Sequence, residues 1–251
     1  MNSKFASILG YHVYMNDLSD ISIYGPKIIN TLNGHSYNVA KKDPEFRKAL
    51  LGSDVLLPDG ESVVLGAKFL GISELHKIAG FDLFFHLMNS LQEKGGSCFF
   101  LGASEKTLSL IMSRVGNEFP NIRVGSFSPP YKAAFSEEDN RIMLGKVNKF
   151  RPDVLFVGMT APKQEKWAYE NRNRLNANVI CSIGAVFDFY AGTTKRPPQW
   201  MINIRMEWLG RLLREPKRMW RRYILSTPVF FIDLVRYKLG FYRVRETKVY
   251  N

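Results

Sequence analysis

The chain has 251 residues, of which 45% are hydrophobic, and a formal net charge of +12. This length and apolar content suit one large α/β domain, or a domain with an appendage, and exclude a disordered or fibrous protein. The two cysteines, Cys98 and Cys181, lie in apolar runs typical of buried strands, so they predict neither a disulfide framework nor a metal site.

Strand and helix patterns alternate along the first 194 residues. Apolar runs predict five strands, over residues 55–58, 97–103, 122–128, 153–159 and 178–185. Helical spacing lies between them, as in 80–95 and 104–119. The alternation predicts an α/β fold with a Rossmann-like, mostly parallel sheet and helices on both faces. Ligands of such sheets bind beyond the carboxyl ends of the strands, so the loops there form the candidate site.

The stretch LLPDGESVVL (56–65) follows the first predicted strand and holds a carboxylate on a tight corner. Pro58 fixes its own φ and Gly60 permits an unusual φ, so Asp59 between them is confined. Asp before Gly is also a common turn, in which the side chain bonds nearby backbone amides. The dipeptide alone favours the turn and leaves a functional site open.

Two further loops follow strands with a glycine. Gly102 precedes Ser104, which can cap the next helix and leave its free amides for a phosphate, although an ordinary turn explains the pattern equally well. After Gly158, three polar side chains open a predicted helix: Lys163, Gln164 and Glu165. They suit recognition of a sugar or nucleotide, and a solvated helix start explains them nearly as well.

Asp188 lies alone among apolar side chains in GAVFDFYAG. A buried carboxylate needs partners, so this residue predicts either a structural hydrogen bond or a ligand contact, with equal support.

Several common chemistries lack their motifs in this sequence. It contains no GxGxxG that opens a first βα unit, no GxxxxGK[ST], no Cys/His pair with zinc spacing, and no Asp-x-Asp at a strand end. We therefore expect no metal and no cofactor. If the substrate is a nucleotide-sugar, protein groups must stabilise its leaving group.

The charge is concentrated in the C-terminal fifth of the chain. Residues 195–251 carry 14 Lys/Arg against 4 Asp/Glu, a net charge of +10, which leaves +2 for residues 1–194. We therefore expect an α/β catalytic domain over 1–194 and a basic, helical appendage over 195–251. Tryptophans and leucines alternate there with cations, as in an interfacial helix on anionic lipid; an ordinary docking helix is the alternative.

The motifs taken together resemble the WecG/TagA/CpsF family of bacterial glycosyltransferases. The similar stretches are PDGESVV (58–64), KIAGFDL (77–83), FLGA (100–103), APKQEKW (161–167), GAVFDFYAGTTKRPP (184–198) and MEWLGRLLREPKR (206–218). The resemblance implies an inverting, metal-independent transfer from a UDP-sugar to a polyprenyl-diphosphate-linked saccharide, in synthesis of teichoic acid, common antigen or exopolysaccharide. It also implies a peripheral location on the inner face of the cytoplasmic membrane.

The resemblance also implies roles for individual residues. It gives catalysis to Asp59, as the base, and to Thr31. It gives substrate binding to Asn33, Lys77, Gln164 and the appendage arginines Arg211, Arg214, Arg218 and Arg221. The loop patterns described above add Gly102, Gly158, Lys163, Glu165 and Asp188 as candidate substrate-binding residues. Two positions depart from the family pattern: Lys77 replaces a common arginine, and Thr160 replaces a common glycine.

Two other functions are compatible with parts of the sequence. A basic, aromatic-rich tail also suits nucleic acid, although the nearly neutral body and the ordered pocket motifs argue against nucleic acid as a partner. A non-catalytic sugar-binding assembly subunit is the other alternative, and Asp59, Thr31 and Gln164 argue against it. N-acetylmannosamine, its uronic acid, glucose and other hexoses all suit the family, and a homo-oligomer is compatible with the sequence.

Overall fold

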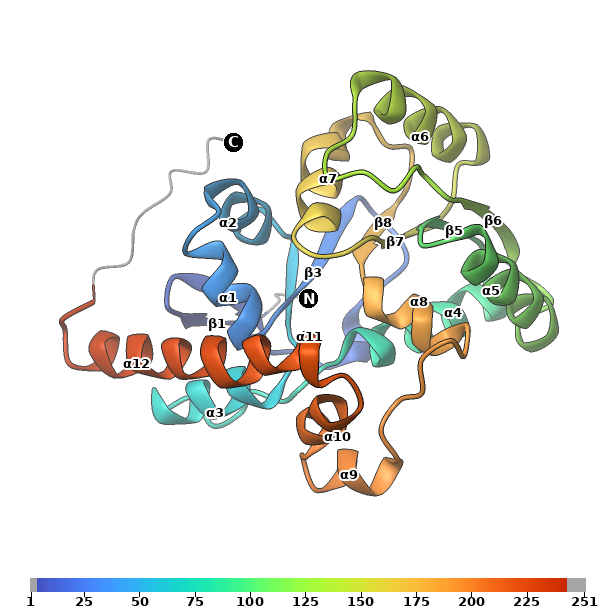
Figure 1. Cartoon of the computed structure of the whole chain (residues 1–251). Helices are drawn as coiled ribbons and strands as arrows, with labels where there is room; N and C mark the ends of the chain where they lie inside the picture. The colour runs from blue at the N-terminus through green and yellow to red at the C-terminus, as the bar shows by residue number, and fades with distance from the viewer. Residues whose placement is uncertain (1–3, 243–251) are drawn as a thin grey trace.

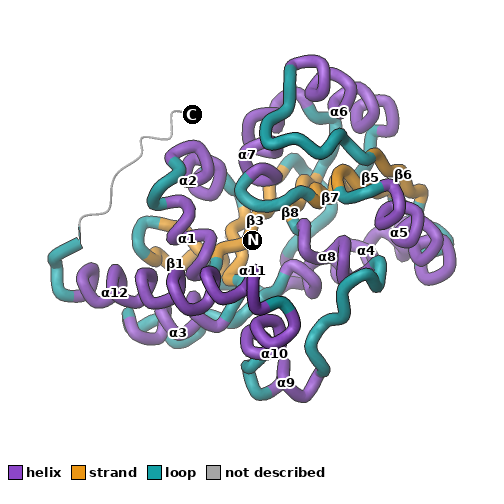
Figure 2. The backbone as a smooth tube through the Cα atoms, viewed as in Figure 1, coloured by secondary structure: helices purple, strands orange, loops and turns teal. Residues whose placement is uncertain are grey.

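The computed structural model describes residues 4–242, except for the side chain of Arg218. Its centre is a sheet of six strands in the order β4-β3-β8-β7-β5-β6, and every pair of neighbours is parallel (Figures 1 and 2). The strands are β3 (Lys27–Leu32), β4 (Val55–Pro58), β5 (Ser97–Gly102), β6 (Arg123–Phe127), β7 (Val154–Gly158) and β8 (Val179–Ser182). The predicted α/β class and all five predicted strands are confirmed.

Three strands were not predicted. The central strand β3 joins β4 to β8 and has the sequence KIINTL, whose buried Asn30 interrupts the apolar run and donates to Ser53 Oγ at 2.9 Å. The others, β1 (Phe5–Ile8) and β2 (Tyr11–Tyr14), form an antiparallel hairpin. Leu9 and Gly10 join them with positive φ angles of 52° and 85°, as a two-residue turn requires.

Helices cover both faces of the sheet, as predicted (Figure 2). Side chains alternate along each strand, so in β5 Phe100 joins one apolar cluster and Phe99 the other. The cluster around Phe100 is completed by α4 (Gly80–Lys94), α5 (Glu105–Glu118) and α8 (Gly184–Tyr190). The cluster around Phe99 is completed by α6 (Glu137–Phe150) and α7 (Lys163–Asn171).

A third apolar cluster lies beside β4 and includes the C-terminal helix. It joins the hairpin to α1 (Gly34–Ala40), α2 (Pro44–Leu51), α3 (Glu61–Phe69) and α12 (Thr227–Lys238). Phe230 and Leu234 of α12 are fully buried there, and the ring of Phe230 packs edge-on against Tyr37. The buried carboxylate of Asp233 accepts hydrogen bonds from Tyr37 and Lys41 of the α1 segment. The last described helix is therefore part of the protein core.

Short helices connect α8 to α12. They are α9 (Gln199–Asn203), α10 (Glu207–Arg214) and α11 (Pro216–Trp220), followed by a π-helical segment, Arg221–Ser226. Figure 1 shows α11, this segment and α12 as one continuous rod that passes α1 and α3. Two 3₁₀ turns, Leu18–Asp20 and Arg172–Arg174, complete the described elements. Within residues 4–242, none of the helices has the length and apolarity needed to cross a bilayer.

Candidate active site

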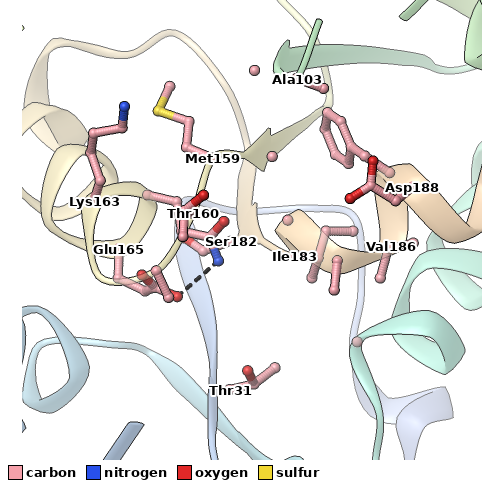
Figure 3. Close-up of a pocket in the computed structure, with 18 of the residues that line it drawn as sticks. Thr31, Ala103, Met159, Thr160, Lys163, Glu165, Ser182, Ile183, Val186 and Asp188 are labelled. Carbon is pink, nitrogen blue, oxygen red and sulfur yellow. Dashed lines mark hydrogen bonds between the residues drawn. The ribbon is translucent and has the colours of Figure 1, made fainter. Parts of the chain in front are cut away.

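A cleft of about 880 Å³ opens at the carboxyl ends of the strands, bounded by the loops after β3, β4, β5, β7 and β8 and by the C-terminal segment. Most of the residues predicted from the sequence line it. They are Thr31, Asn33, Asp59, Gly102, Gly158, Lys163, Gln164, Glu165, Asp188 and Arg211. Figure 3 shows residues from these loops around the cavity, with Asp188 on the opposite side of the view from Glu165.

Asp59 lies in the cleft on the corner between β4 and α3. Its backbone N–H donates to Leu32 O at 2.9 Å, and Gly60, the N-cap of α3, takes a φ of +120° that favours glycine. Gly60 has no side chain with which to cap α3. Gly60 therefore turns the chain without strain, and the half-buried Asp59 lines the cleft.

The electrostatics of Asp59 are set by burial and by nearby cations. Burial raises the pKa of its carboxyl above the ordinary 3.8, while the positive charges of Arg222, Arg211 and Lys77 act in the opposite direction. The negative charge of Glu207 raises the pKa further. A carboxylate with a raised pKa accepts a proton more readily than a solvated one, as a general base requires.

Arg211 brings unused hydrogen-bond donors to the cleft. Its guanidinium lies 5.2 Å from the centre of the Phe189 ring. Its Nε and Nη2 atoms are buried and have no hydrogen-bond partner among the described residues. A buried guanidinium without acceptors is costly, and an anionic ligand such as a diphosphate would satisfy it.

Glu207 organises the other cations beside the cleft. Its carboxylate pairs with Lys77 at 2.7 Å and with Arg196 at 3.6 Å. Burial would raise the pKa of Glu207, but the hydrogen bond and charge of Lys77 outweigh burial and lower it. Glu207 and Arg196 line the cleft, whereas Lys77 lies behind Glu207 and lines a smaller neighbouring pocket. The predicted contact between Lys77 and the substrate stays a prediction.

The four predicted appendage arginines do not share one position. Arg211 lines the cleft, but Arg214 donates to the carbonyl oxygens of Lys195 and Arg196. Arg221 is exposed, with its guanidinium 5.4 Å from the centre of the Trp220 ring. The side chain of Arg218 is outside the described part of the structure. Arg222, not predicted as a site residue, lines the cleft instead.

Sequence periodicity could not place Arg222. Pro216 ends α10 and the following π-helical segment changes the number of residues per turn. The helical spacing read from Arg211 therefore does not continue to Arg222.

Gly102 and Gly158 both make room for close packing around β7. A Cβ on Gly102, whose φ is +124°, would lie 2.3 Å from Gly158 O, and a Cβ on Gly158 would lie 2.4 Å from the Phe187 ring. Gly102 therefore allows the close approach of β5 and β7, and Gly158 allows the ring of Phe187 from α8 to pack against β7. Packing therefore explains both glycines without a contact to a ligand.

Thr31 and Asn33 flank the end of β3. Asn33 Oδ1 accepts from the backbone N–H groups of His35 and Ser36 and so caps α1. This cap commits the oxygen of Asn33 and leaves its amide nitrogen for a ligand. Thr31 lines the cleft on the opposite side of Figure 3 from Ala103.

Lys163 and Asp188 both line the cleft and both have partners. Lys163 Nζ donates to Lys132 O at 2.8 Å and lies 4.5 Å from the centre of the Phe135 ring. The half-buried carboxylate of Asp188 accepts from Thr193 Oγ1 at 3.4 Å. Asp188 thus makes a structural contact and also faces the cavity (Figure 3).

Gln164, Glu165 and Ser182 form a buried polar wall. Gln164 Nε2 donates to Glu165 Oε1 at 2.8 Å, the dashed contact of Figure 3. Burial raises the pKa of Glu165 to about 7, against a smaller lowering by the hydrogen bond from Gln164. Among the described residues, no group of three or more His, Cys, Asp or Glu side chains is arranged to hold a metal ion.

Comparison with known proteins identifies relatives along most of the chain. The family model described as "Glycosyl transferase WecG/TagA/CpsF family" matches residues 9–244. A Bacillus subtilis protein is 30% identical over 209 residues, which cover 83% of this chain and 79% of that protein. A Bacillus spizizenii protein is 32% identical over 199 residues (79% and 75%), and a Staphylococcus aureus protein is 26% identical over 210 residues (84% and 80%). All three are named N-acetylglucosaminyldiphosphoundecaprenol N-acetyl-beta-D-mannosaminyltransferase.

Proposed function

The chain belongs to the WecG/TagA/CpsF family of glycosyltransferases, and from that premise we propose that it moves a sugar from a UDP-sugar to a polyprenyl-diphosphate-linked saccharide. The names of the relatives make N-acetylmannosamine the first donor sugar to test and N-acetylglucosaminyl diphosphate the first acceptor head group. The beta linkage in those names supports a direct, inverting displacement. Teichoic acid or a similar cell-surface polysaccharide is the expected product.

The observation that carries this proposal is the position of Asp59 in a cleft that also holds Arg211 and Arg222. Asp59 takes the proton of the acceptor hydroxyl as the oxygen of that hydroxyl attacks the anomeric carbon of the donor. The bond from the anomeric carbon to the diphosphate oxygen breaks, and UDP leaves with an added negative charge. The unused donors of Arg211 stabilise that charge.

The direct test is a transfer assay with a short-chain lipid-diphosphate N-acetylglucosamine and a set of UDP-sugars. We expect product from at least one N-acetylated donor, and released UDP in equal amount. An oligonucleotide at matched salt serves as the control for the nucleic-acid alternative. Tight oligonucleotide binding with no turnover of any UDP-sugar contradicts the proposal.

Metal independence is a separate expectation. The cleft supplies arginines rather than a cluster of carboxylates for the diphosphate, so the transfer rate should be unchanged in excess EDTA. The measurement is the initial rate before and after chelation, with a Mg²⁺-dependent kinase as the positive control for the chelator. A rate that collapses in EDTA and returns with Mg²⁺ or Mn²⁺ would reveal a metal site.

The C-terminal segment supports binding at a membrane surface. Large exposed side chains gather on α9 to α12: Trp200, Ile204, Trp208, Leu213, Trp220, Ile224, Leu225, Ile232, Val235 and Leu239. Lys217, Arg221, Arg236 and Lys238 are exposed on the same helices. Aromatic and aliphatic side chains mixed with cations suit the head-group region of anionic lipid. We propose that this contact lies on the inner face of the cytoplasmic membrane, as the family resemblance implies.

Replacing Lys217 and Arg221 together by Gln should weaken sedimentation with anionic vesicles. Each cation near such a surface contributes about 1 kcal/mol, so the loss should be roughly tenfold or more at low salt and small at high salt. The matched control replaces two exposed lysines elsewhere by Gln: Lys42, in the turn between α1 and α2, and Lys149 of α6. Equal losses in both double variants would show that total charge, and not this surface, holds the protein to the vesicle.

A further inference from the structure

Three oxygens of the buried polar wall lack partners although their residues line the cleft. They are Gln164 Oε1, Glu165 Oε2 and Ser182 Oγ, and none has a hydrogen-bond partner among the described residues. Gln164, Glu165 and Ser182 are 5%, 4% and 1% exposed. A buried polar atom without a partner costs about 1–3 kcal/mol, so three in one wall call for a ligand that supplies the missing bonds.

One hydrogen bond and one glycine fit the wall around Gln164. The hydrogen bond from Gln164 Nε2 to Glu165 Oε1 fixes the side-chain amide, so its oxygen remains as the unused acceptor. A Cβ on Gly184 would lie 2.5 Å from that oxygen, so glycine at this position makes room for it. Figure 3 shows Glu165 and Ser182 on the same side of the cavity, from α7 and β8.

The three oxygens differ in what they can offer. Gln164 Oε1 is an acceptor, and the Ser182 hydroxyl is a donor or an acceptor. Glu165 Oε2 is a donor when the carboxyl is protonated, and its pKa of about 7 makes that form abundant at neutral pH. Together they match a group that carries one N–H and one C=O. A secondary amide is such a group.

We propose that Gln164, Glu165 and Ser182 form a subsite for the acetamido group of an N-acetylated sugar. The ligand N–H donates to Gln164 Oε1, and the ligand carbonyl accepts from Ser182 Oγ and protonated Glu165. This assignment rests on the proposed function. The names of the relatives give an N-acetyl group both to the transferred sugar and to the acceptor sugar. Either sugar is a possible source of the amide, and the experiment separates them.

Burial, and not a charged neighbour, is the main cause of the raised pKa of Glu165. On its own helix, Lys166 pairs with Asp43 and Glu45 of the α2 segment, and Lys163 bonds a backbone carbonyl. Glu170 of α7 is exposed, and Lys48 of α2 lies over the Tyr169 ring. The side chains at the carboxyl ends of β3, β7 and β8, nearest the wall, are uncharged. After β4, the titratable side chain that lines the cleft is Asp59.

Calorimetric binding tests the subsite without requiring turnover. Affinities would be measured for UDP-N-acetylmannosamine against UDP-mannose, and for N-acetylglucosaminyl diphosphate against glucosyl diphosphate. We expect the wild type to prefer the N-acetylated member of one pair, and Ser182→Ala and Glu165→Ala each to lower that preference about tenfold. The pair that responds identifies the sugar. Glu170→Gln, an exposed change on the same helix, should leave both preferences intact.

The pH dependence separates a hydrogen-bonding role from a structural one. The preference of the wild type should fall as the pH rises through about 7, because ionised Glu165 cannot donate. Comparing two ligands at each pH cancels the titration of Asp59, which affects both. Glu165→Gln keeps a donor and should keep the preference at every pH. The inference is overturned if the variants weaken both members of each pair equally, whether or not the transfer assay yields product.

Discussion

Replacing Asp59 by Asn should lower kcat by about 10²–10⁴-fold while the free energy of unfolding changes little, because the amide keeps the shape of the carboxyl but cannot take a proton. The backbone N–H of Asp59 closes the corner and is retained in the variant. Steady-state transfer kinetics and thermal unfolding would be compared for both proteins. Glu61→Gln is the matched control, since Glu61 is the first residue of α3, two positions after Asp59, and does not line the cleft.

The pH profile of the wild type gives a second measure of the same role. A base must be ionised, so kcat/KM should fall on the acid side as the pH drops through the pKa of Asp59. Because burial raises that pKa, the fall should lie above 3.8, the value of a solvated carboxyl. Near-wild-type turnover of Asp59→Asn, with normal donor affinity, would remove Asp59 from the role of base.

Replacing Phe230 by Ala should destabilise the protein by about 3–5 kcal/mol, although this residue belongs to the segment that the charge pattern assigns to an appendage. The ring is fully buried against Tyr37 and the third apolar cluster, so its removal leaves a cavity. Urea unfolding of the whole chain would measure the loss. Ile232→Ala is the control, because Ile232 lies two residues further along α12 and is 51% exposed, and it should cost less than about 1 kcal/mol. Equal, small losses would show that α12 docks weakly.

The same burial changes what a truncation can reveal. Cutting the chain before α12 removes Phe230 and Leu234 from the core together with the cations of the segment. Loss of activity would then reflect a damaged fold as much as a lost membrane contact. Point changes on the exposed face of the segment are the sharper test of membrane binding.

The sequence was sufficient for most of the sheet because buried parallel strands are short, continuous apolar runs bounded by glycine or proline. The strand β3 was not predicted because Asn30 and Thr31 break that pattern. The amide nitrogen of Asn30 donates to Ser53 Oγ, whereas its oxygen has no hydrogen-bond partner among the described residues. Its central place in the sheet follows from pairing with β4 and β8, which no local pattern encodes.

The site was predicted where its residues follow strands, and only in part where they come from the C-terminal segment, of which Arg211 was predicted. Asp59 directly follows β4, and Gln164 opens α7 after β7; the topology brings the ends of these strands together. Arg196, Glu207 and Arg222 reach the cleft because of how α9 to α12 fold back, and an amphipathic pattern does not say which face meets the protein. One available signal was Glu207, an isolated acid in a strongly basic segment.

The π-helical segment Arg221–Ser226 links two positions that must hold at once: Arg222 in the cleft, and Phe230 with Leu234 in the core. Each residue of an α-helix advances the side-chain direction by about 100°, and a wide turn changes that count. If one residue were removed or added between Arg222 and Phe230, Arg222 could not point into the cleft while Phe230 and Leu234 stayed in the core. Over evolutionary time this stretch should therefore tolerate exchanges of its outward side chains far more readily than insertions or deletions, so its length is a more stringent constraint than its composition.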